Sequence, residues 1–391
     1  MTQRAYKFRF YPTEEQEQIL AKTFGCVRYV YNWGLRLKTD AYYNDGKRLY
    51  YKDLSAQLTV MKQQTETIWL NEVSSVALQQ SLRHLDRAFI NFFEGHGAYP
   101  QFHKKHGKQS ASFMSSAFKW DGQNITLAKM SEPLNIRWSR RFASAPSSVT
   151  ISKDSADRYH ISILVDEEIP TAPSCDKQVG IDLGLADAVI LSTGQKFGNP
   201  RFLRKDEKKL AKVQRQLAKK QKGSRNRAKA RLKVARIHAK IADRRNDFLH
   251  KLSTQLIHEN QVIAVESLQV KNMIRNHHLA KAIADVGWSE FVRQLEYKAQ
   301  WYGRTVVKID KFYPSSKRCF DCGYVMPKMS LNIRYWTCPA CGVHHDRDVN
   351  AAQNILAAGL AVFACGEPIR PARKLKSQRA GTPQRNRKAN V

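Results

Sequence analysis

Four cysteines in the C-terminal part of the chain constrain its fold more than any other feature. They form two pairs, with two residues inside each pair and fifteen residues between the pairs: Cys319, Cys322, Cys338 and Cys341. Two pairs at this spacing can surround one tetrahedral zinc ion with thiolates. The alternative, cysteines that pack as small apolar side chains, is disfavoured because Gly323 and Gly342 closely follow the pairs. The spacing therefore predicts a zinc ribbon with one structural zinc ion.

Acidic residues form the second important pattern. Asp346 and Asp348 follow the last cysteine, and Asp182 and Glu266 lie in or at the end of apolar, strand-like segments. An unpaired charge there would cost several kcal/mol, although a single strand-end acid is more commonly a turn residue. Carboxylate oxygens suit Mg²⁺ or Mn²⁺. If the two strands are neighbours in one sheet, the acids could share two such ions and act on a phosphodiester.

The charge of the chain indicates a polyanionic partner. Its 391 residues include 66 Lys and Arg against 34 Asp and Glu, a formal net charge of +32. Repulsion on that scale destabilises a compact state unless a polyanion neutralises it. Nucleic acid fits best, because aromatic residues, which stack on bases, make up 10% of the chain. A merely soluble basic protein and a binder of anionic membranes are the weaker alternatives.

Secretion and membrane insertion are not indicated by any segment. No apolar run approaches the roughly 18 residues that cross a bilayer, and residues 1–11 lack the apolar core of a signal peptide. Cys26, Cys175 and Cys365 stand apart from one another and are expected to be buried or free thiols. We therefore expect a cytoplasmic protein without a membrane partner.

Residues 1–12 and 96–170 are predicted to form an antiparallel, OB-like β-barrel. Apolar and basic residues alternate over 5–11, the pattern of a half-buried strand. Short strand-like runs, interrupted by Gly, Ser and Pro, follow at 149–152 and 159–165. The first strand is expected to join this barrel although a long segment separates it from the others.

That separating segment, residues 13–95, is predicted to be a helical insertion, beginning at a capping box with Thr13 as the N-cap and Gln16 at the third helical position. Its clearest helix has one apolar face, made by Leu78, Leu82, Leu85, Phe89, Phe92 and Phe93. The outward face carries Gln79, Gln80, Arg83 and Arg87. Solvated surface and nucleic-acid contact are equally good interpretations of that face.

The second half of the chain alternates strand-like and helical segments. Strands are predicted at 178–183, 188–191, 262–268 and 305–309, and helices near 288–301 and 350–360. The cysteine module interrupts this order as an insertion at 316–342. The two halves together predict a multidomain chain of the α+β and α/β classes.

Two segments are strongly basic. Residues 201–245 carry nineteen Lys and Arg against three acidic residues, and a break at 223–224 predicts a helical hairpin. We expect it to lie along a phosphate backbone. The residues proposed for those contacts are Lys208, Lys209, Lys212, Arg215, Lys219, Arg227 and Arg231. Residues 366–391 carry eight basic residues, one acidic residue and three prolines, and are predicted to be disordered without nucleic acid.

Several segments together resemble the TnpB family, transposon-encoded RNA-guided DNA nucleases related to the type V CRISPR effectors. They are Gly180–Gly184, Ala264–Leu268, the four-cysteine module and Asp346–Ile355. The resemblance extends over nearly the whole chain, and the order and spacing of the segments agree with the family.

This resemblance implies specific domains and roles. Residues 175–315 and 343–365 would form a RuvC-like, RNase H-type nuclease domain with Asp182, Glu266 and Asp348 as its metal-binding acids. Asp346 is the competitor for the third position. The antiparallel first half would be the wedge barrel, and its helical insertion would be the recognition lobe.

The implied activity is metal-dependent cleavage of double-stranded DNA in the prokaryotic cytosol or nucleoid. A guide RNA from the transposon end would select the target, next to a short flanking motif, with one protein chain per RNA favoured. Gln79, Gln80 and Arg83 are the candidates for reading that motif. A catalytically silent RNA-guided repressor and a strand-transfer transposase remain alternatives.

Overall fold

The computed structural model describes residues 2–330 and 332–365, so the predicted disordered tail lies outside the described residues. The chain divides into two compact units, Met1–Thr171 with Phe202–Asn246, and Ala172–Arg201 with Asp247–Val391. The basic hairpin is thus grouped with the first half, whereas the domain limits predicted from the sequence assign it to the nuclease domain. Those limits stay a prediction.

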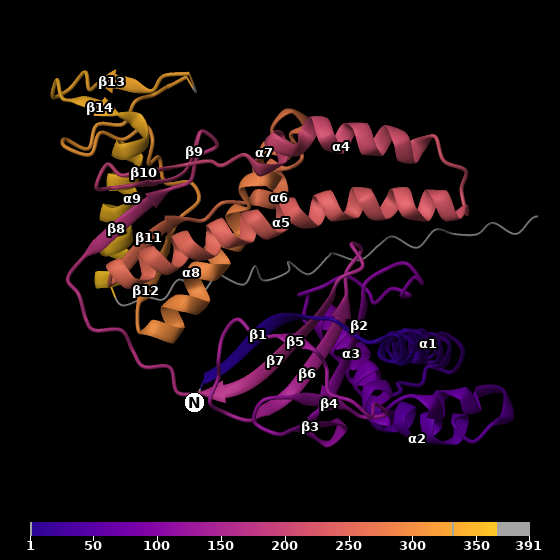
Figure 1. Ribbon diagram of the computed structural model, residues 1–391. Helices are drawn as coiled ribbons and strands as arrows, with labels where there is room; N and C mark the ends of the chain where they lie inside the picture. The colour runs from indigo at the N-terminus through magenta and orange to yellow at the C-terminus, as the bar shows by residue number, and fades with distance from the viewer. Residues whose placement is uncertain (1, 331, 366–391) are drawn as a thin grey trace, which may run out of the picture. The chain divides into compact units, whose positions relative to one another are not determined.

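The first unit contains a five-stranded antiparallel sheet (Figure 1). Its strand order is β2 (Gln109–Met114), β6 (Pro146–Lys153), β7 (Tyr159–Glu167), β1 (Thr2–Phe10) and β5 (Ile136–Arg137). A small hairpin, β3 (Phe118–Trp120) and β4 (Ile125–Leu127), lies beside the short 3₁₀ turn η2 (Ser115–Ala117).

The N-terminal strand lies inside this sheet, between β7 and β5, as the sequence predicted. Tyr6, Phe8 and Phe10 are buried on one face, which is why a strand with alternating basic residues can pack there. Strands β2 and β5 are the two edge strands of this sheet. Closure into an OB-like barrel therefore stays a prediction.

Helices α1 (Glu14–Asp45), α2 (Tyr51–Met61) and α3 (Ser75–Phe93), with the 3₁₀ segment η1 (Thr65–Glu72), form the predicted helical insertion. The capping box is confirmed: the Gln16 amide donates to Thr13 Oγ1 at 3.3 Å, and the Thr13 amide donates to Gln16 Oε1 at 3.2 Å. The apolar face of α3 is buried from Leu78 to Phe89. The prediction is wrong for Phe93, which ends the helix beyond this core and is 75% exposed.

The basic segment forms the predicted helical hairpin, α4 (Phe202–Ala218) and α5 (Arg225–Glu259). The helices are separated at Gly223, whose φ of +85° is readily adopted only by glycine.

The second unit is built on a mixed sheet with the order β10 (Lys196–Gly198), β9 (Asp187–Leu191), β8 (Gln178–Asp182), β11 (Val262–Glu266) and β12 (Thr305–Ile309). Strands β8, β11 and β12 are parallel, and β9 is antiparallel to β8 and β10. The predicted strands are therefore confirmed. The remaining helices are α6 (Val270–Met273), α7 (His277–Val286), α8 (Trp288–Tyr302) and α9 (Arg347–Ala364).

Helix α9 packs directly on this sheet, and two glycines make the close approach possible (Figure 1). A Cβ on Gly180 of β8 would lie 2.0 Å from the carbonyl oxygen of Ala352. A Cβ on Gly359 of α9 would lie 2.4 Å from Cβ of Ala264 in β11. Side chains at either position would push the helix away from the strands that carry Asp182 and Glu266.

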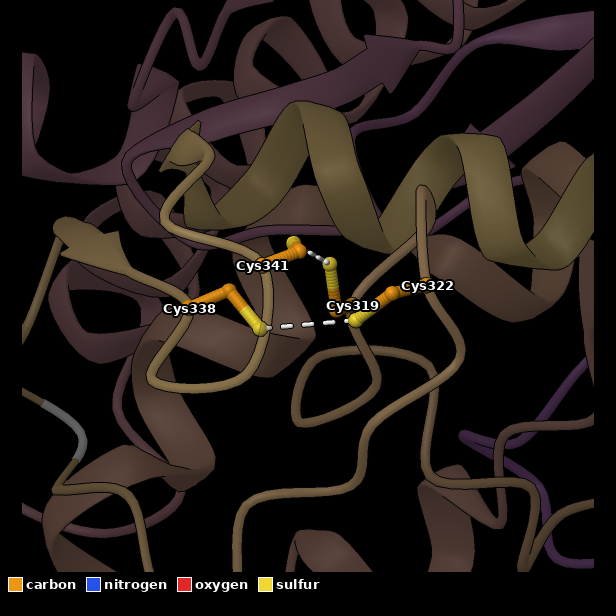
Figure 2. Close-up of side chains that lie close together, drawn as sticks. All are labelled: Cys319, Cys322, Cys338 and Cys341. Carbon is orange, nitrogen blue, oxygen red and sulfur yellow. Dashed lines mark hydrogen bonds between the residues drawn. The ribbon is translucent and has the colours of Figure 1, made fainter.

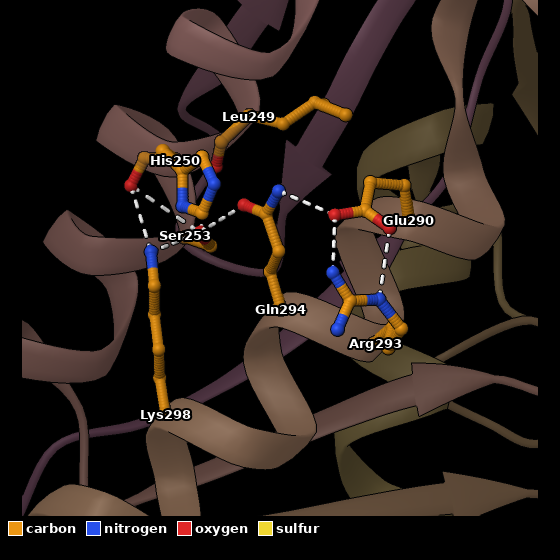
Figure 3. Close-up of polar contacts among 7 residues, drawn as sticks. All are labelled: Leu249, His250, Ser253, Glu290, Arg293, Gln294 and Lys298. Atoms are coloured by element: carbon orange, nitrogen blue, oxygen red, sulfur yellow. Dashed lines mark hydrogen bonds and ion pairs between the residues drawn. The ribbon is translucent and has the colours of Figure 1, made fainter. Parts of the chain in front are cut away.

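Helices α5 and α8 are joined by a buried polar network (Figure 3). Lys298 Nζ donates to the carbonyl oxygen of His250 at 2.9 Å and to Ser253 Oγ and Thr254 Oγ1 at 2.7 Å each. The Ser253 hydroxyl also lies 3.0 Å from Gln294 Oε1. Burial lowers the pKa of Lys298 to about 8, because the ammonium group loses its hydration.

Candidate functional site

Asp182 and Glu266 lie at the same end of two neighbouring parallel strands. Ile181 of β8 pairs with Val265 of β11, so the next residue on each strand is one of these two acids. In a parallel pair, neighbouring residues at matched positions project to the same face of the sheet. Burial, then the charge of Glu266 and then that of Asp348 raise the pKa of Asp182 to about 8. The structure therefore brings Asp182 close to both other predicted acids.

Glu266 has a specific hydrogen-bond donor. The hydroxyl of Ser315 donates to Glu266 Oε1 at 2.6 Å, a short distance typical of a charge-assisted bond. Burial raises the pKa of Glu266, and the Ser315 hydrogen bond acts in the opposite direction. The sequence analysis gave Ser315 no role at the acid cluster, because a serine before a cysteine pair does not by itself indicate a carboxylate partner.

Asp346 and Asp348 occupy different environments at the beginning of α9. Asp346 is the N-cap: its Oδ1 accepts hydrogen bonds from the amides of Asp348 at 3.0 Å and Val349 at 3.1 Å. Its Oδ2 lies 2.6 Å from Lys196 Nζ. Although burial opposes the shift, these contacts hold the pKa of Asp346 below its usual value. Both carboxylate oxygens of Asp346 thus already have hydrogen-bond or ion-pair partners within the protein.

Asp348 lies in the first turn of α9, and its Oδ2 is 3.4 Å from Arg334 of the cysteine module. Arg347, between the two acids, donates from its guanidinium to the carbonyl oxygens of Ser330 and Ile333. The start of α9 is therefore fixed to the segment that links the two cysteine pairs.

The acid cluster suits hard divalent cations by its chemistry. The three acids supply carboxylate oxygens, and the raised pKa of Asp182 means that its negative charge is unfavourable beside the other acids, a cost that Mg²⁺ or Mn²⁺ would offset. The three carboxylates do not form a tight group. Over residues 2–330 and 332–365, the groups of three or more ligand atoms within 4.8 Å of one another lie in the cysteine module.

The four predicted cysteines converge as expected (Figure 2). Their sulfur atoms all lie within 4.8 Å of one another, with Cys319 and Cys341 at 3.7 Å and Cys322 and Cys338 at 3.6 Å. These distances are far longer than the roughly 2.05 Å of a disulfide. The set of four thiols from two turns fits one tetrahedral zinc ion.

The backbone of each cysteine pair forms the same turn. The amide of Gly323 donates to the carbonyl of Cys319 at 3.0 Å, and that of Gly342 donates to the carbonyl of Cys338 at 2.9 Å. Both glycines have a φ of +78°, which explains their place after each pair. A short hairpin, β13 (Tyr335–Thr337) and β14 (His344–Asp346), follows the linking segment and contains the second turn.

His345 lies in β14 and is buried. Its Nε2 is 3.0 Å from Cys319 Sγ and 3.7 Å from Asp321 Oδ2. These three side chains form a second group whose ligand atoms lie within 4.8 Å. Contact with one cysteine sulfur fits a residue that supports the cysteine site from outside the set of four ligands.

The predicted nucleic-acid contacts differ in accessibility. On α3, Gln79 and Arg83 are exposed and Gln80 is half-buried, and the Arg83 guanidinium lies 4.3 Å from the ring centroid of Tyr51. Most of the residues predicted to contact phosphates on the basic hairpin are exposed: Lys208, Lys209, Lys212, Arg215, Lys219 and Arg231.

Arg227 is different from these residues. It is half-buried, and its guanidinium donates to the carbonyl of Lys220 at 2.6 Å and to that of Leu217 at 3.2 Å. This side chain closes the hairpin, because it joins the beginning of α5 to carbonyl oxygens at and just beyond the end of α4.

Among the described helices, none is both long enough and apolar enough to cross a membrane.

Comparison with known proteins gives a consistent family assignment. A family described as "Probable transposase" matches residues 160–277, a "Cas12f1-like, TNB domain" matches 288–355, and a "Helix-turn-helix domain" matches 1–47. In this structure the last range holds β1 and the single long helix α1. The chain resembles a solved Cas12f1-sgRNA-target DNA complex at a TM-score of 0.56 and 12% identity, over 90% of this chain and 98% of that one, which shows a shared fold.

Two relatives carry the assignment. A Streptomyces pristinaespiralis protein named "Putative RNA-guided DNA endonuclease" is 52% identical over 97% of this chain and 94% of its own length. The Escherichia coli protein named "Putative RNA-guided DNA endonuclease InsQ" is 36% identical over 96% of this chain and 97% of its own length. With identity of this level over almost the full length of both chains, the protein belongs to the TnpB family of transposon-encoded, RNA-guided endonuclease-type proteins.

Proposed function

We propose that this chain is an RNA-guided DNA endonuclease that hydrolyses phosphodiester bonds, with Asp182, Glu266 and Asp348 as its metal-binding acids. The observation that carries the proposal is the placement of Asp182 and Glu266 at the same end of two neighbouring parallel strands. Burial and the charges of Glu266 and Asp348 accordingly raise the pKa of Asp182 to about 8. Mutual repulsion of neighbouring carboxylates costs stability, and strongly shifted acids of this kind are typical of sites that bind cations or transfer protons.

The three acids come from three elements of the second unit. Asp182 and Glu266 lie at the ends of the neighbouring strands β8 and β11, and Asp348 lies in the first turn of α9. Asp348 is the better third ligand than Asp346, because the oxygens of Asp346 already bind two amides and Lys196. When bound, two Mg²⁺ or Mn²⁺ ions supply charge stabilisation for the attacking and leaving oxygens of the phosphodiester. We expect products with 5′-phosphate and 3′-hydroxyl ends.

The strand order of the second unit supports a RuvC-like, RNase H-type nuclease domain. Strands β10, β9 and β8 pair antiparallel, and β11 and β12 extend the sheet from β8 as parallel strands. We assign this domain to residues 175–315 and 343–365, with the cysteine module at 316–342 as an insertion that holds one structural zinc ion. The sheet of the first unit would be the wedge, OB-like barrel, and residues 13–95 its recognition insertion.

The proposed partners are a guide RNA from the transposon end and double-stranded target DNA, with one chain per RNA. The solved relative of similar fold is a complex with sgRNA and target DNA, as its title states. The exposed lysines and arginines of α4 and α5 support a phosphate contact in this chain. Gln79, Gln80 and Arg83 are the candidates for reading a flanking motif.

The test is a plasmid cleavage assay. The protein is purified together with a guide RNA whose variable end has been redesigned. We expect cutting to follow the new guide end and to require the flanking motif. Sequencing of the products separates the alternatives: linear ends support the nuclease, joined strands indicate a transposase, and protected but uncut DNA indicates a repressor. Cleavage at the same place by RNA-free protein would contradict guidance by RNA.

A further inference from the structure

The loop that connects β12 to the first cysteine pair contacts both candidate metal sites. Ser315 lies in this loop, is 5% exposed, and donates its hydroxyl hydrogen bond to Glu266 Oε1 at 2.6 Å. Only three residues separate Ser315 from Cys319, the first cysteine of the module. The same short loop therefore reaches the half-buried Glu266 carboxylate at one end and a predicted zinc ligand at the other.

Two asparagines of α9 fix this loop. Asn354 Nδ2 donates to the carbonyl oxygen of Ser315 at 3.0 Å and to that of Arg318 at 2.7 Å. Asn350 Nδ2 donates to the same Arg318 oxygen at 2.7 Å, and Asn350 Oδ1 accepts from the amide of Phe320 at 2.9 Å. Both asparagines are almost fully buried, at 1% and 2% exposure, so these bonds are shielded from water.

The helix that carries these asparagines also carries Asp348, two residues before Asn350. Asn350 and Asn354 are four residues apart and lie on one face of the helix, against the loop. Backbone atoms on both sides of Cys319 are thus tied to the helix that presents the third acid, and Ser315 ties the second acid to the same loop.

We propose that Ser315 is a positioning residue for Glu266, and that Asn354 and Asn350 couple the cysteine module to the acid cluster through it. This inference rests on the proposed function. A hydroxyl donor on Oε1 restricts the rotation of the Glu266 carboxylate and would leave its other oxygen available to a cation. Support of this kind for a metal-binding carboxylate typically changes metal affinity by roughly 10- to 100-fold.

The first experiment measures Mn²⁺ binding to full-length, zinc-loaded, nucleic-acid-free chain by titration calorimetry. Ser315→Ala should weaken the Glu266-dependent Mn²⁺ binding by roughly 10- to 100-fold, and Ser315→Thr, which restores the hydroxyl, should recover most of it. Ser316→Ala is the matched control, because Ser316 is the half-buried neighbour of Ser315 and the hydroxyl that contacts Glu266 is that of Ser315; this variant should bind Mn²⁺ as the wild type does. Glu266→Gln gives the baseline for Mn²⁺ bound elsewhere.

A cleavage readout separates positioning from general damage. For Ser315→Ala with guide RNA, the Mg²⁺ concentration at half-maximal rate should rise by roughly 10- to 100-fold, while the rate at saturating Mg²⁺ stays close to the wild-type rate. A zinc content of one ion per chain in this variant would show an intact module. Unchanged Mn²⁺ affinity, or a loss of zinc that Ser315→Thr does not restore, would overturn the inference.

The coupling has its own measurement, the equilibrium zinc affinity from competition with a zinc-selective chelator. If the two sites are coupled, saturating Mn²⁺ should change the zinc affinity of the wild type, because linkage between the binding free energies of two ligands is reciprocal. Asn354→Leu removes the two hydrogen bonds of Asn354 to the loop and leaves those of Asn350, so the effect of Mn²⁺ on zinc affinity should become smaller. An equal effect of Mn²⁺ in wild type and Asn354→Leu would overturn the coupling.

Failure of this inference differs from failure of the proposed function. If wild type and Glu266→Gln bind Mn²⁺ equally, the acids are not a metal site and the proposed function fails. If the wild type binds more tightly than Glu266→Gln but Ser315→Ala matches the wild type, the acid site stands and the positioning role alone is wrong.

Discussion

A β-carbon on Gly180 would lie 2.0 Å from the carbonyl oxygen of Ala352, so strand β8 and helix α9 touch through backbone atoms. This contact sets the distance between Asp182, two residues further along the strand, and Asp348, four residues earlier in the helix. A glycine in an apolar strand thus has a direct consequence for the geometry of the acid cluster.

We expect Gly180→Ala to lower the midpoint of thermal unfolding and to abolish Mg²⁺-dependent cleavage, because a backbone atom cannot move away without displacing α9. Differential scanning calorimetry and a plasmid cleavage assay test this. Gly25→Ala is the control: a Cβ there meets nothing within 4 Å, so a gain of up to about 1 kcal/mol from helix propensity is expected. A Gly180→Ala chain as stable and active as the wild type would contradict the role of the contact.

Asp182→Ala, Glu266→Ala and Asp348→Ala should each reduce cleavage below detection, because each removes an oxygen ligand from the proposed metal pair. Binding of guide RNA and target DNA should persist, since it depends on lysines and arginines. Gel-shift and cleavage assays on the same preparations separate the two effects. Substantial cleavage by any of the three variants would remove that residue from the site.

Asp346→Asn and Asp348→Asn should behave differently. Asparagine is a good N-cap, so Asp346→Asn keeps the hydrogen bonds to the amides of Asp348 and Val349 and loses only the charge pairing with Lys196. We expect it to retain most of the cleavage rate, whereas Asp348→Asn is inactive. The reverse order of activities would show that Asp346 is the third acid.

Removal of zinc should loosen the cysteine module and, through α9, the acid cluster. Metal analysis of protein purified without chelator should find one zinc ion for the four cysteines, and Cys319→Ser or Cys341→Ser should lose it. Cys26→Ser, at a cysteine outside the module, serves as the control. Wild-type protein without zinc would disprove the structural metal.

Lys298 predicts a pH effect with a definite sign. Burial lowers its pKa to about 8, below its unfolded value of about 10.4. Between these values the unfolded chain binds a proton that the native chain lacks, so this residue makes the native state more stable as pH rises and costs most stability below pH 8. Relative to Lys298→Met, the wild type should therefore gain stability from pH 8 to pH 10.

The measurement is the unfolding midpoint of both chains across this pH range. Lys251→Met is the matched control, because the Lys251 side chain is 77% exposed and sits on the same helix as Ser253. Its difference from the wild type should not change with pH. A constant difference for Lys298→Met as well would show that Lys298 is not destabilised by burial.

The sequence by itself predicted those features that depend on local spacing. The two cysteine pairs, the Thr13 capping box, the strands around Asp182 and Glu266 and the hairpin break at Gly223 all follow from residues close together in the chain. The TnpB resemblance rests on the same local segments, and for that reason it could be stated before any fold was known.

Tertiary structure decided the features that depend on distant residues. Phe93 has the helical period of a core residue but lies beyond the core that α1 and α3 share. The guanidinium of Arg227 is hydrogen-bonded to the carbonyl oxygens of Leu217 and Lys220. The commitment of Asp346 to Lys196, and the hydrogen bond from Ser315 to Glu266, join residues 150 and 49 positions apart. No spacing rule reports such contacts, because they arise only when the packing of α9 on the sheet brings these segments together.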